Sequence, residues 1–223
     1  MFSLKKNIQQ FWKGDQSLTV LSIILVIHIF IVIPLGQKGH FQQAIFIVFY
    51  ISMLVAGVFM LTANKLLRIL APVILGLMVL LSTGVLLKSS VVEIANDLVI
   101  VLFCILLSWV VLIRTFSEGP VTVHRIQGSI VVYLLLSFIF ALLYHILFLL
   151  RPDIAFKGLG SSDRKELMYF SLTTLTTTGY GDITPSFAAS RSFANLEALI
   201  GQLYPAILIA RLVSMEFEHS KKK

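Results

Sequence analysis

A polar run between two apolar stretches holds the residues best suited to chemistry. Residues 173–185 read TTLTTTGYGDITP, with glycines at the alternate positions Gly179 and Gly181. A dehydrated cation needs several oxygen ligands along a narrow path, and backbone carbonyls supply them when successive residues turn C=O to one side. The two glycines permit that geometry because they reach torsion angles closed to residues with a Cβ atom, and Thr177 adds a hydroxyl. The run favours a carbonyl-lined cation path; an ordinary polar turn between helices is the alternative.

The composition predicts that membrane helices position this run. Hydrophobic residues make up 57% of the 223 residues, charged residues make up 13%, and the mean hydropathy is +0.93, whereas globular proteins have about 25% charged residues. Each apolar stretch is roughly long enough to cross a core of about 30 Å, the fourth if it begins nearer Val91. We expect helices because lipid cannot pair backbone polar groups. The predicted spans are residues 18–35, 41–63, 69–87, 98–113, 126–150 and 192–210.

A short re-entrant helix is expected between the fifth and sixth spans. Ser162 or Asp163 can cap a helix that runs to about Thr176, directly before the polar run. A helix of that length cannot cross a membrane, but it can stop halfway if protein surrounds its end. The predicted fold class is therefore an all-α membrane protein with six transmembrane helices, a re-entrant pore helix and a filter loop.

The polar run also carries a longer pattern, T-x-x-T-x-G-Y-G-D, formed by Thr174, Thr177, Gly179, Tyr180, Gly181 and Asp182. With a span on each side, it resembles the pore signature of the potassium channel family. The resemblance implies a homotetramer that conducts K⁺ passively and needs no cofactor beyond the permeant ion. The implied K⁺-binding residues of the selectivity filter are Thr177, Thr178, Gly179 and Tyr180, followed by Gly181. Thr178 stands where the family often has valine, and its side chain is expected to face away from the ion.

The resemblance also implies residues that support the filter, among them Thr174. Tyr169 and Phe170 stand where the family places an aromatic pair that braces the filter, although they can equally be core aromatics. Asp182 is expected to form an acidic ring at the outer mouth, or to cap or pair locally. Glu197, an ionisable group inside a span, needs a partner.

We expect the partner of Glu197 to be Arg191 or polar backbone behind the filter. Direct ion coordination by Glu197 is the alternative.

The sixth stretch is similar to the inner helix of bacterial channels of this kind. Gly201 falls twenty residues after Gly181, where relatives often carry a glycine that lets the helix bend, and Pro205 removes a backbone donor one turn later. We predict a gating hinge here; close helix packing around Gly201 is the alternative. The fourfold spacing of Pro205, Ile209 and Val213 predicts that they line the lower pore.

The predicted domains are a cytoplasmic N-terminus (1–17), a four-span peripheral domain with its linker (18–125), a pore domain (126–218) and a basic tail (219–223). Placing both termini in the cytoplasm puts 11 of the 18 basic residues inside and 7 outside, as expected for a multi-pass protein of the plasma membrane. Voltage-gated relatives carry Arg or Lys at every third position of the fourth span. Here that span has Arg114 alone, with Glu93 and Asp97 near its outer end, so voltage sensing is not expected.

Several other classes are disfavoured by the sequence. The net charge of +7 is scattered between apolar segments, so membrane lipids rather than nucleic acid are the expected partners. Cys104 cannot form an intrachain disulfide, and His28 and His145 lack neighbours at metal-site spacing, so all three are expected to be packing residues. No pattern of an enzyme is present.

Three alternative functions stay open. A non-selective cation channel is disfavoured by Tyr180. A potassium-uptake transporter subunit usually carries four pore segments in one chain, and a regulatory membrane protein would have a closed pore. The sequence does not identify the gating stimulus.

Overall fold

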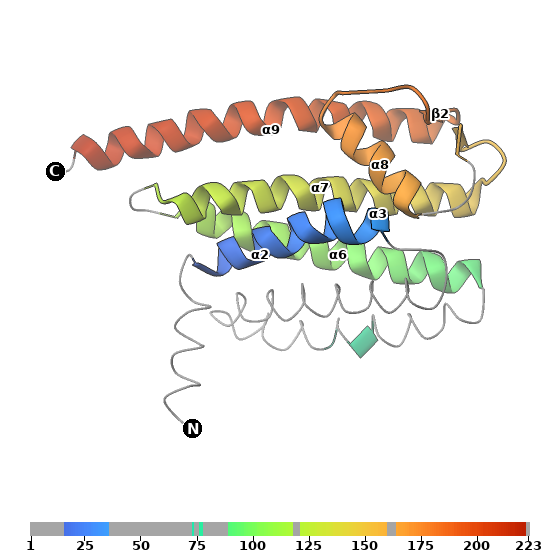
Figure 1. The fold of residues 1–223 in the computed structure, drawn as a ribbon, viewed down its shortest axis with the longest axis horizontal. Helices are drawn as coiled ribbons and strands as arrows, with labels where there is room; N and C mark the ends of the chain where they lie inside the picture. Colours follow the sequence, from blue (N-terminus) through green and yellow to red (C-terminus); the bar gives the residue numbers. More distant parts are fainter. Residues whose placement is uncertain are drawn as a thin grey trace.

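The computed structural model describes residues 16–35, 73, 76–77, 89–117, 121–159 and 164–221. The predicted spans 41–63 and, except for three residues, 69–87 lie outside the described residues, as do the predicted caps Ser162 and Asp163. The described chain is helical apart from one pair of short strands (Figure 1). Its elements are α2 (Gln16–Ile27), the π-helical turn η1 (His28–Val32), α3 (Ile33–Leu35), α6 (Ser90–Thr115), α7 (Val123–Leu150), β1 (Phe156–Lys157), α8 (Arg164–Leu175), β2 (Thr184–Pro185) and α9 (Ala188–Lys221).

Three of the described helices are long and apolar enough to cross a membrane: α6, α7 and the part of α9 from Ala188 to Phe217. A helix satisfies its own backbone polar groups, which is why apolar stretches of this length take that form in lipid. The start of α6 at Ser90 agrees with the predicted start near Val91. α9 extends the predicted sixth span at both ends, and the shorter apolar segment Leu18–Val32 falls in the first predicted span.

α7 is the central helix, since α2, α6, α8 and α9 all pack against it (Figure 1). One buried cluster joins α7 to the peripheral helices, with Leu21 of α2, Leu107 of α6 and Leu135 of α7 almost fully enclosed. A second cluster joins α7 to the pore elements through aromatic residues such as Tyr144 and Phe156. Lipid tails are as apolar as leucine, so close packing and polar links, rather than exclusion of water, hold such helices together.

The short helix α8 lies where the sequence predicts a re-entrant helix. Its 12 residues extend only about 18 Å, less than a hydrocarbon core of about 30 Å. β1 pairs antiparallel with β2, placing Phe156 opposite Pro185. Gly158 follows β1 with φ +81°, and a Cβ atom there would lie 1.9 Å from the carbonyl oxygen of Asp182. Only glycine fits this position, so the loop after α7 lies directly against the residue that follows the glycine-rich segment.

α9 passes equally close to the end of α8. A Cβ atom on buried Gly201 would lie 1.9 Å from the carbonyl oxygen of Leu175. This contact gives Gly201 a packing role, which is the alternative that the sequence left open beside a hinge. The helix runs without interruption through Pro205, and the hinge at these two residues stays a prediction.

We predict that Gly201→Ala destabilises the protein. Alanine gains about 1 kcal/mol of helix propensity over glycine, but its methyl group would force two backbones apart, and such overpacking costs about 1–3 kcal/mol. The thermal unfolding temperature in detergent should therefore fall. Ala206→Ser, which adds one atom at an exposed site on the same helix, should change it little. A Gly201→Ala protein as stable as the parent would show that α8 and α9 separate freely.

Candidate functional site

The backbone of residues 177–181 alternates between two kinds of torsion. Thr177, Gly179 and Gly181 have φ values of +56°, +54° and +80°, whereas Thr178 and Tyr180 between them do not have positive φ. In a chain of alternating handedness, successive N–H groups gather on one side and the carbonyl groups on the other. No heavy atom lies within 4 Å of a Cβ built on Gly179 or Gly181. The torsion, rather than crowding, therefore requires glycine at these two positions.

The N–H groups at the start of this segment bind the end of α8. Thr177 donates to the carbonyl of Thr174 at 2.9 Å, and Thr178 and Gly179 both donate to the carbonyl of Thr173 at 2.8 and 3.1 Å. These bonds satisfy carbonyls that a helix end would otherwise leave without a partner. They also fix the direction in which the chain leaves α8, and they leave the opposite side of the segment to the carbonyl groups.

The segment is anchored at both ends and open along its length. Leu175 before it and Ile183 after it are buried, while residues 176–182 are exposed in the single chain. Tyr180 is 70% exposed. Exposed polar backbone is tolerated in a membrane protein where it faces protein or a water-filled path.

Threonine hydroxyls reinforce the end of α8. The Oγ1 atoms of Thr178 and Thr176 are 2.9 Å apart, and that of Thr176 donates to the carbonyl of Leu172 at 2.7 Å. The Thr178 side chain is thus turned back toward α8. Thr174, which the sequence assigns to filter support, donates its hydroxyl to the carbonyl of Phe170 within the same helix at 2.8 Å.

Tyr169 contacts the far end of the glycine-rich segment. Its ring stacks on that of Tyr180, with centroids 6.2 Å apart and an interplanar angle of 2°. A hydrogen bond to the carboxylate of Asp182 raises the pKa of the Tyr169 hydroxyl. Asp182 also accepts a bond from the N–H of Ile183 at 3.0 Å. The structure therefore shows the local pairing of Asp182 that the sequence offered as an alternative.

Phe170 lies on another side of α8, in the core. It is 5% exposed, and its ring makes edge contacts with Tyr144 and Phe156 at centroid distances of 5.0 and 5.4 Å. The neighbouring aromatics therefore divide between two environments. Tyr169 contacts Tyr180, while Phe170 joins α8 to α7 and β1.

Glu197 of α9 is fully buried between α7 and α8. Tyr144 donates its hydroxyl to Oε2 at 2.6 Å, and the Oγ atom of Ser171 contacts Oε1. The expected pairing with Arg191 is wrong, because Arg191 donates to the carbonyl of Pro185 at 3.2 Å. Residues six apart on a helix do not face each other, since neighbouring positions are three or four apart.

Three tyrosines that the sequence analysis missed connect these elements. Besides Tyr144, Tyr133 of α7 donates to the carbonyl of Leu175 at 3.1 Å, and its ring stacks on Tyr204 of α9 at 5.9 Å. Tyr204 in turn donates to the carbonyl of Ser129 at 2.9 Å. A buried tyrosine hydroxyl usually finds a hydrogen-bond partner. Tyrosines inside apolar spans are therefore the sequence feature that could have indicated these links between helices.

The predicted lower-pore residues Pro205, Ile209 and Val213 all lie on α9, and Ile209 and Val213 are 62% and 49% exposed. Their assignment to the lower pore stays a prediction. Within the described part of the chain, no cluster of three His, Cys, Asp or Glu side chains could hold a metal ion.

The hydrogens around Glu197 predict that its carboxyl is neutral. Ser171 has one hydroxyl hydrogen, and its Oγ lies 2.7 Å from the carbonyl of Ser137, which can only accept. If Ser171 donates there, the hydrogen in its contact with Glu197 belongs to the carboxyl. Glu197→Gln should therefore keep near-parental thermal stability in detergent, because the amide NH₂ can donate to Ser171 and the amide oxygen can accept from Tyr144.

Glu197→Ala, by contrast, should destabilise the protein, because a buried Tyr144 hydroxyl without an acceptor costs about 1–3 kcal/mol. In a protein that also carries Tyr144→Phe, the loss of stability caused by Glu197→Ala should be smaller, because no hydroxyl is left without an acceptor. Equal losses from Gln and Ala would instead show that the carboxylate is charged.

Comparisons with known proteins show to which family this chain belongs. Residues 129–218, from α7 to near the end of α9, match the family model described as ion channel. The chain is also 35% identical over 98 residues to Protein LctB of Bacillus caldotenax, covering 39% of this chain and 68% of that protein. No solved structure gives a significant match. The chain therefore belongs to the ion channel family.

Proposed function

We propose that this ion channel is potassium-selective and that residues 177–181 are its selectivity filter. The observation that carries the proposal is the alternation of left-handed torsions at Thr177, Gly179 and Gly181. With the first N–H groups bound to α8, the carbonyls are available to replace the water shell of a dehydrated cation, as in known potassium channels. The K⁺-binding residues are then Thr177, Thr178, Gly179 and Tyr180.

The surroundings of the filter support selectivity for one ion. Tyr180 stacks on Tyr169, which also binds Asp182, so the outer end of the filter is tied to α8. The inner end is held by hydrogen bonds to Thr173 and Thr174. A path held at both ends keeps its carbonyl spacing. In this proposal Asp182 lies at the outer mouth, and the C-terminal end of α8 favours a cation on the axis through its dipole.

The proposed assembly is a homotetramer in the cell membrane, with both termini in the cytoplasm. One chain supplies one filter segment, open along its length, and potassium-type filters use four. α9 also presents an apolar face that the other described elements leave open, on which Leu196, Leu199, Leu203 and Ile207 are each about half exposed or more. In the tetramer this face would meet neighbouring subunits, lipid or the central pore.

Recording from purified protein in planar bilayers tests the proposed selectivity. With K⁺ on one side and an equal concentration of Na⁺ on the other, the reversal potential should lie far from zero, with the K⁺ side negative. The mass in detergent should be that of four chains. Tyr180→Asp should move the reversal potential toward zero with the tetramer intact, because it alters the filter and not the spans. Trp109→Phe, which changes an exposed aromatic residue on α6, is the control.

Other results would favour the alternatives. A parental reversal potential near zero would indicate a non-selective cation channel, and an intact tetramer without current would indicate a regulatory protein. A conducting monomer would exclude four chains around one path and suggest the transporter alternative. An unchanged permeability ratio in Tyr180→Asp would remove this residue from the mechanism.

We also predict that opening depends weakly on voltage. The fourth predicted span is α6, in which Arg114 lies in the last turn. Even full transit of four Arg114 side chains would supply about 9 kcal/mol per 100 mV, against about 28–37 for a sensor with three to four charges per subunit. Conductance should therefore change gradually between strongly negative and strongly positive potentials. A gating charge of about a dozen, the size of a full sensor, would contradict this assignment.

A further inference from the structure

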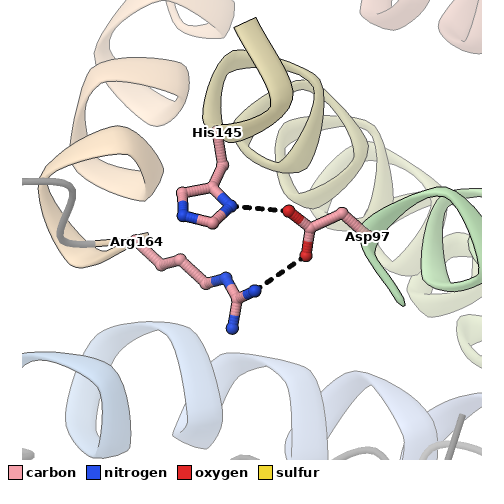
Figure 2. A network of polar contacts seen from close by, with 3 residues as sticks. All are labelled: Asp97, His145 and Arg164. Atoms are coloured by element: carbon pink, nitrogen blue, oxygen red, sulfur yellow. Dashed lines mark hydrogen bonds and ion pairs between the residues drawn. The ribbon is translucent and has the colours of Figure 1, made fainter. Parts of the chain in front are cut away.

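A buried charged cluster links the peripheral helix α6 to the start of the pore helix α8 (Figure 2). Asp97 of α6 is fully enclosed. One of its carboxylate oxygens lies 2.9 Å from Nη2 of Arg164, the first residue of α8, and the other lies 2.5 Å from Nδ1 of His145 on α7. The three residues come from three helices, so the cluster joins elements that are far apart in the sequence.

The chemistry of the cluster requires both partners. A carboxylate two turns inside an apolar helix has lost its hydration, and such a group persists in membranes when it is paired. The guanidinium supplies the opposite charge, and the Nδ1–H of His145 donates to the second oxygen. Both oxygens of Asp97 are thus engaged, and its position is fixed relative to α7 and α8.

The position of Arg164 indicates that the ion pair does more than balance the charge of Asp97. A cation in the first turn of a helix is opposed by the helix dipole, whose positive end lies there. Lys165 adds a second cation, and Glu166 in the same turn supplies one negative charge. The negative charge of Asp97 offsets that repulsion from outside the helix. Otherwise α6 packs along α7, and α8 packs against α7 and α9. The described polar link from α6 to α8 is therefore placed at the end of α8 opposite to the filter.

We propose that Asp97 is a positioning residue for ion conduction: it fixes the start of α8, so that movement of α6 reaches the filter through α8. The proposal rests on the proposed function, since it takes residues 177–181 as the filter. α8 is one continuous helix from Arg164 to Leu175, and its last carbonyls hold the first filter N–H groups. A displacement of its first turn is therefore passed to the filter backbone. In this proposal the peripheral helices regulate conduction by moving the filter. They do not act by bending α9.

The test compares variants of the full chain reconstituted in bilayers, with the Na⁺-to-K⁺ permeability ratio, the K⁺ current and the assembled mass as readouts. Asp97→Asn removes the charge while keeping the shape. The double variant Asp97→Asn/Arg164→Gln removes both charges of the pair, so that neither of these two charges is left without the other. Glu93→Gln removes a half-buried carboxylate one turn earlier on α6 and is the matched control. Arg164→Lys keeps the charge and is the conservative variant.

We expect the double variant to assemble like the parent but to change its permeability ratio or its current at least about fivefold, the lower range for energetic coupling between two sites. Asp97→Asn should show the same change wherever it assembles, Arg164→Lys should restore most of the parental behaviour, and Glu93→Gln should have no effect. This pattern would not arise if the pair served only to neutralise buried charge, because the double variant would then behave like the parent.

Three results would overturn the inference. The first is a double variant with parental selectivity and current, the second is an equal effect from Glu93→Gln, and the third is a double variant that does not assemble, since the pair would then act in folding. Each of these results applies only when the parent protein is itself K⁺-selective. A parent without K⁺ selectivity would instead refute the proposed function, so the two failures are distinguishable.

Discussion

The reversal of the chain at the end of α8 is the interaction on which the rest of the pore depends. Three successive N–H groups, from Thr177 to Gly179, turn back onto the carbonyls of Thr173 and Thr174. Because the N–H and C=O of a trans peptide unit point in opposite directions, the carbonyls of Thr176, Thr177 and Thr178 are left on the other side of the chain. The alternating torsions continue this arrangement to Gly181. A helix that simply ended in a loop would present mixed donors and acceptors and could not offer a cation a uniform path.

The elements around α8 hold that reversal in place from several directions. Tyr133 binds the carbonyl of Leu175, and Gly201 brings the backbone of α9 against the same atom. Ser171 and Tyr144 meet at Glu197 on the side facing α7. In lipid, apolar packing brings helices together with little directional preference, whereas hydrogen bonds between buried groups select one register. The polar residues inside the spans therefore determine how α7, α8 and α9 fit together.

These contacts also limit how the pore can move. Leu175 contacts Gly201 so closely that a bend of α9 at this glycine would displace the end of α8. At the other end of α8, Arg164 is bound to Asp97 of α6. Inner and peripheral helices thus both meet the short helix α8. Under the proposed function, regulation and selectivity share this one helix.

Local chemistry makes several features of the fold readable from the amino-acid sequence. The glycine-rich segment had to adopt unusual torsions because Gly179 and Gly181 stand at alternate positions, and the bounds of α6, α7 and α8 followed from apolar length and turn residues. The pairing of the buried polar groups, by contrast, became visible only in the folded chain. Glu197 contacts Tyr144 and Ser171 rather than Arg191. Asp97 binds Arg164, which lies 67 residues later in the chain. Periodicity gives the face of a helix on which a residue lies, but the partner depends on how separate helices pack, which no local pattern records.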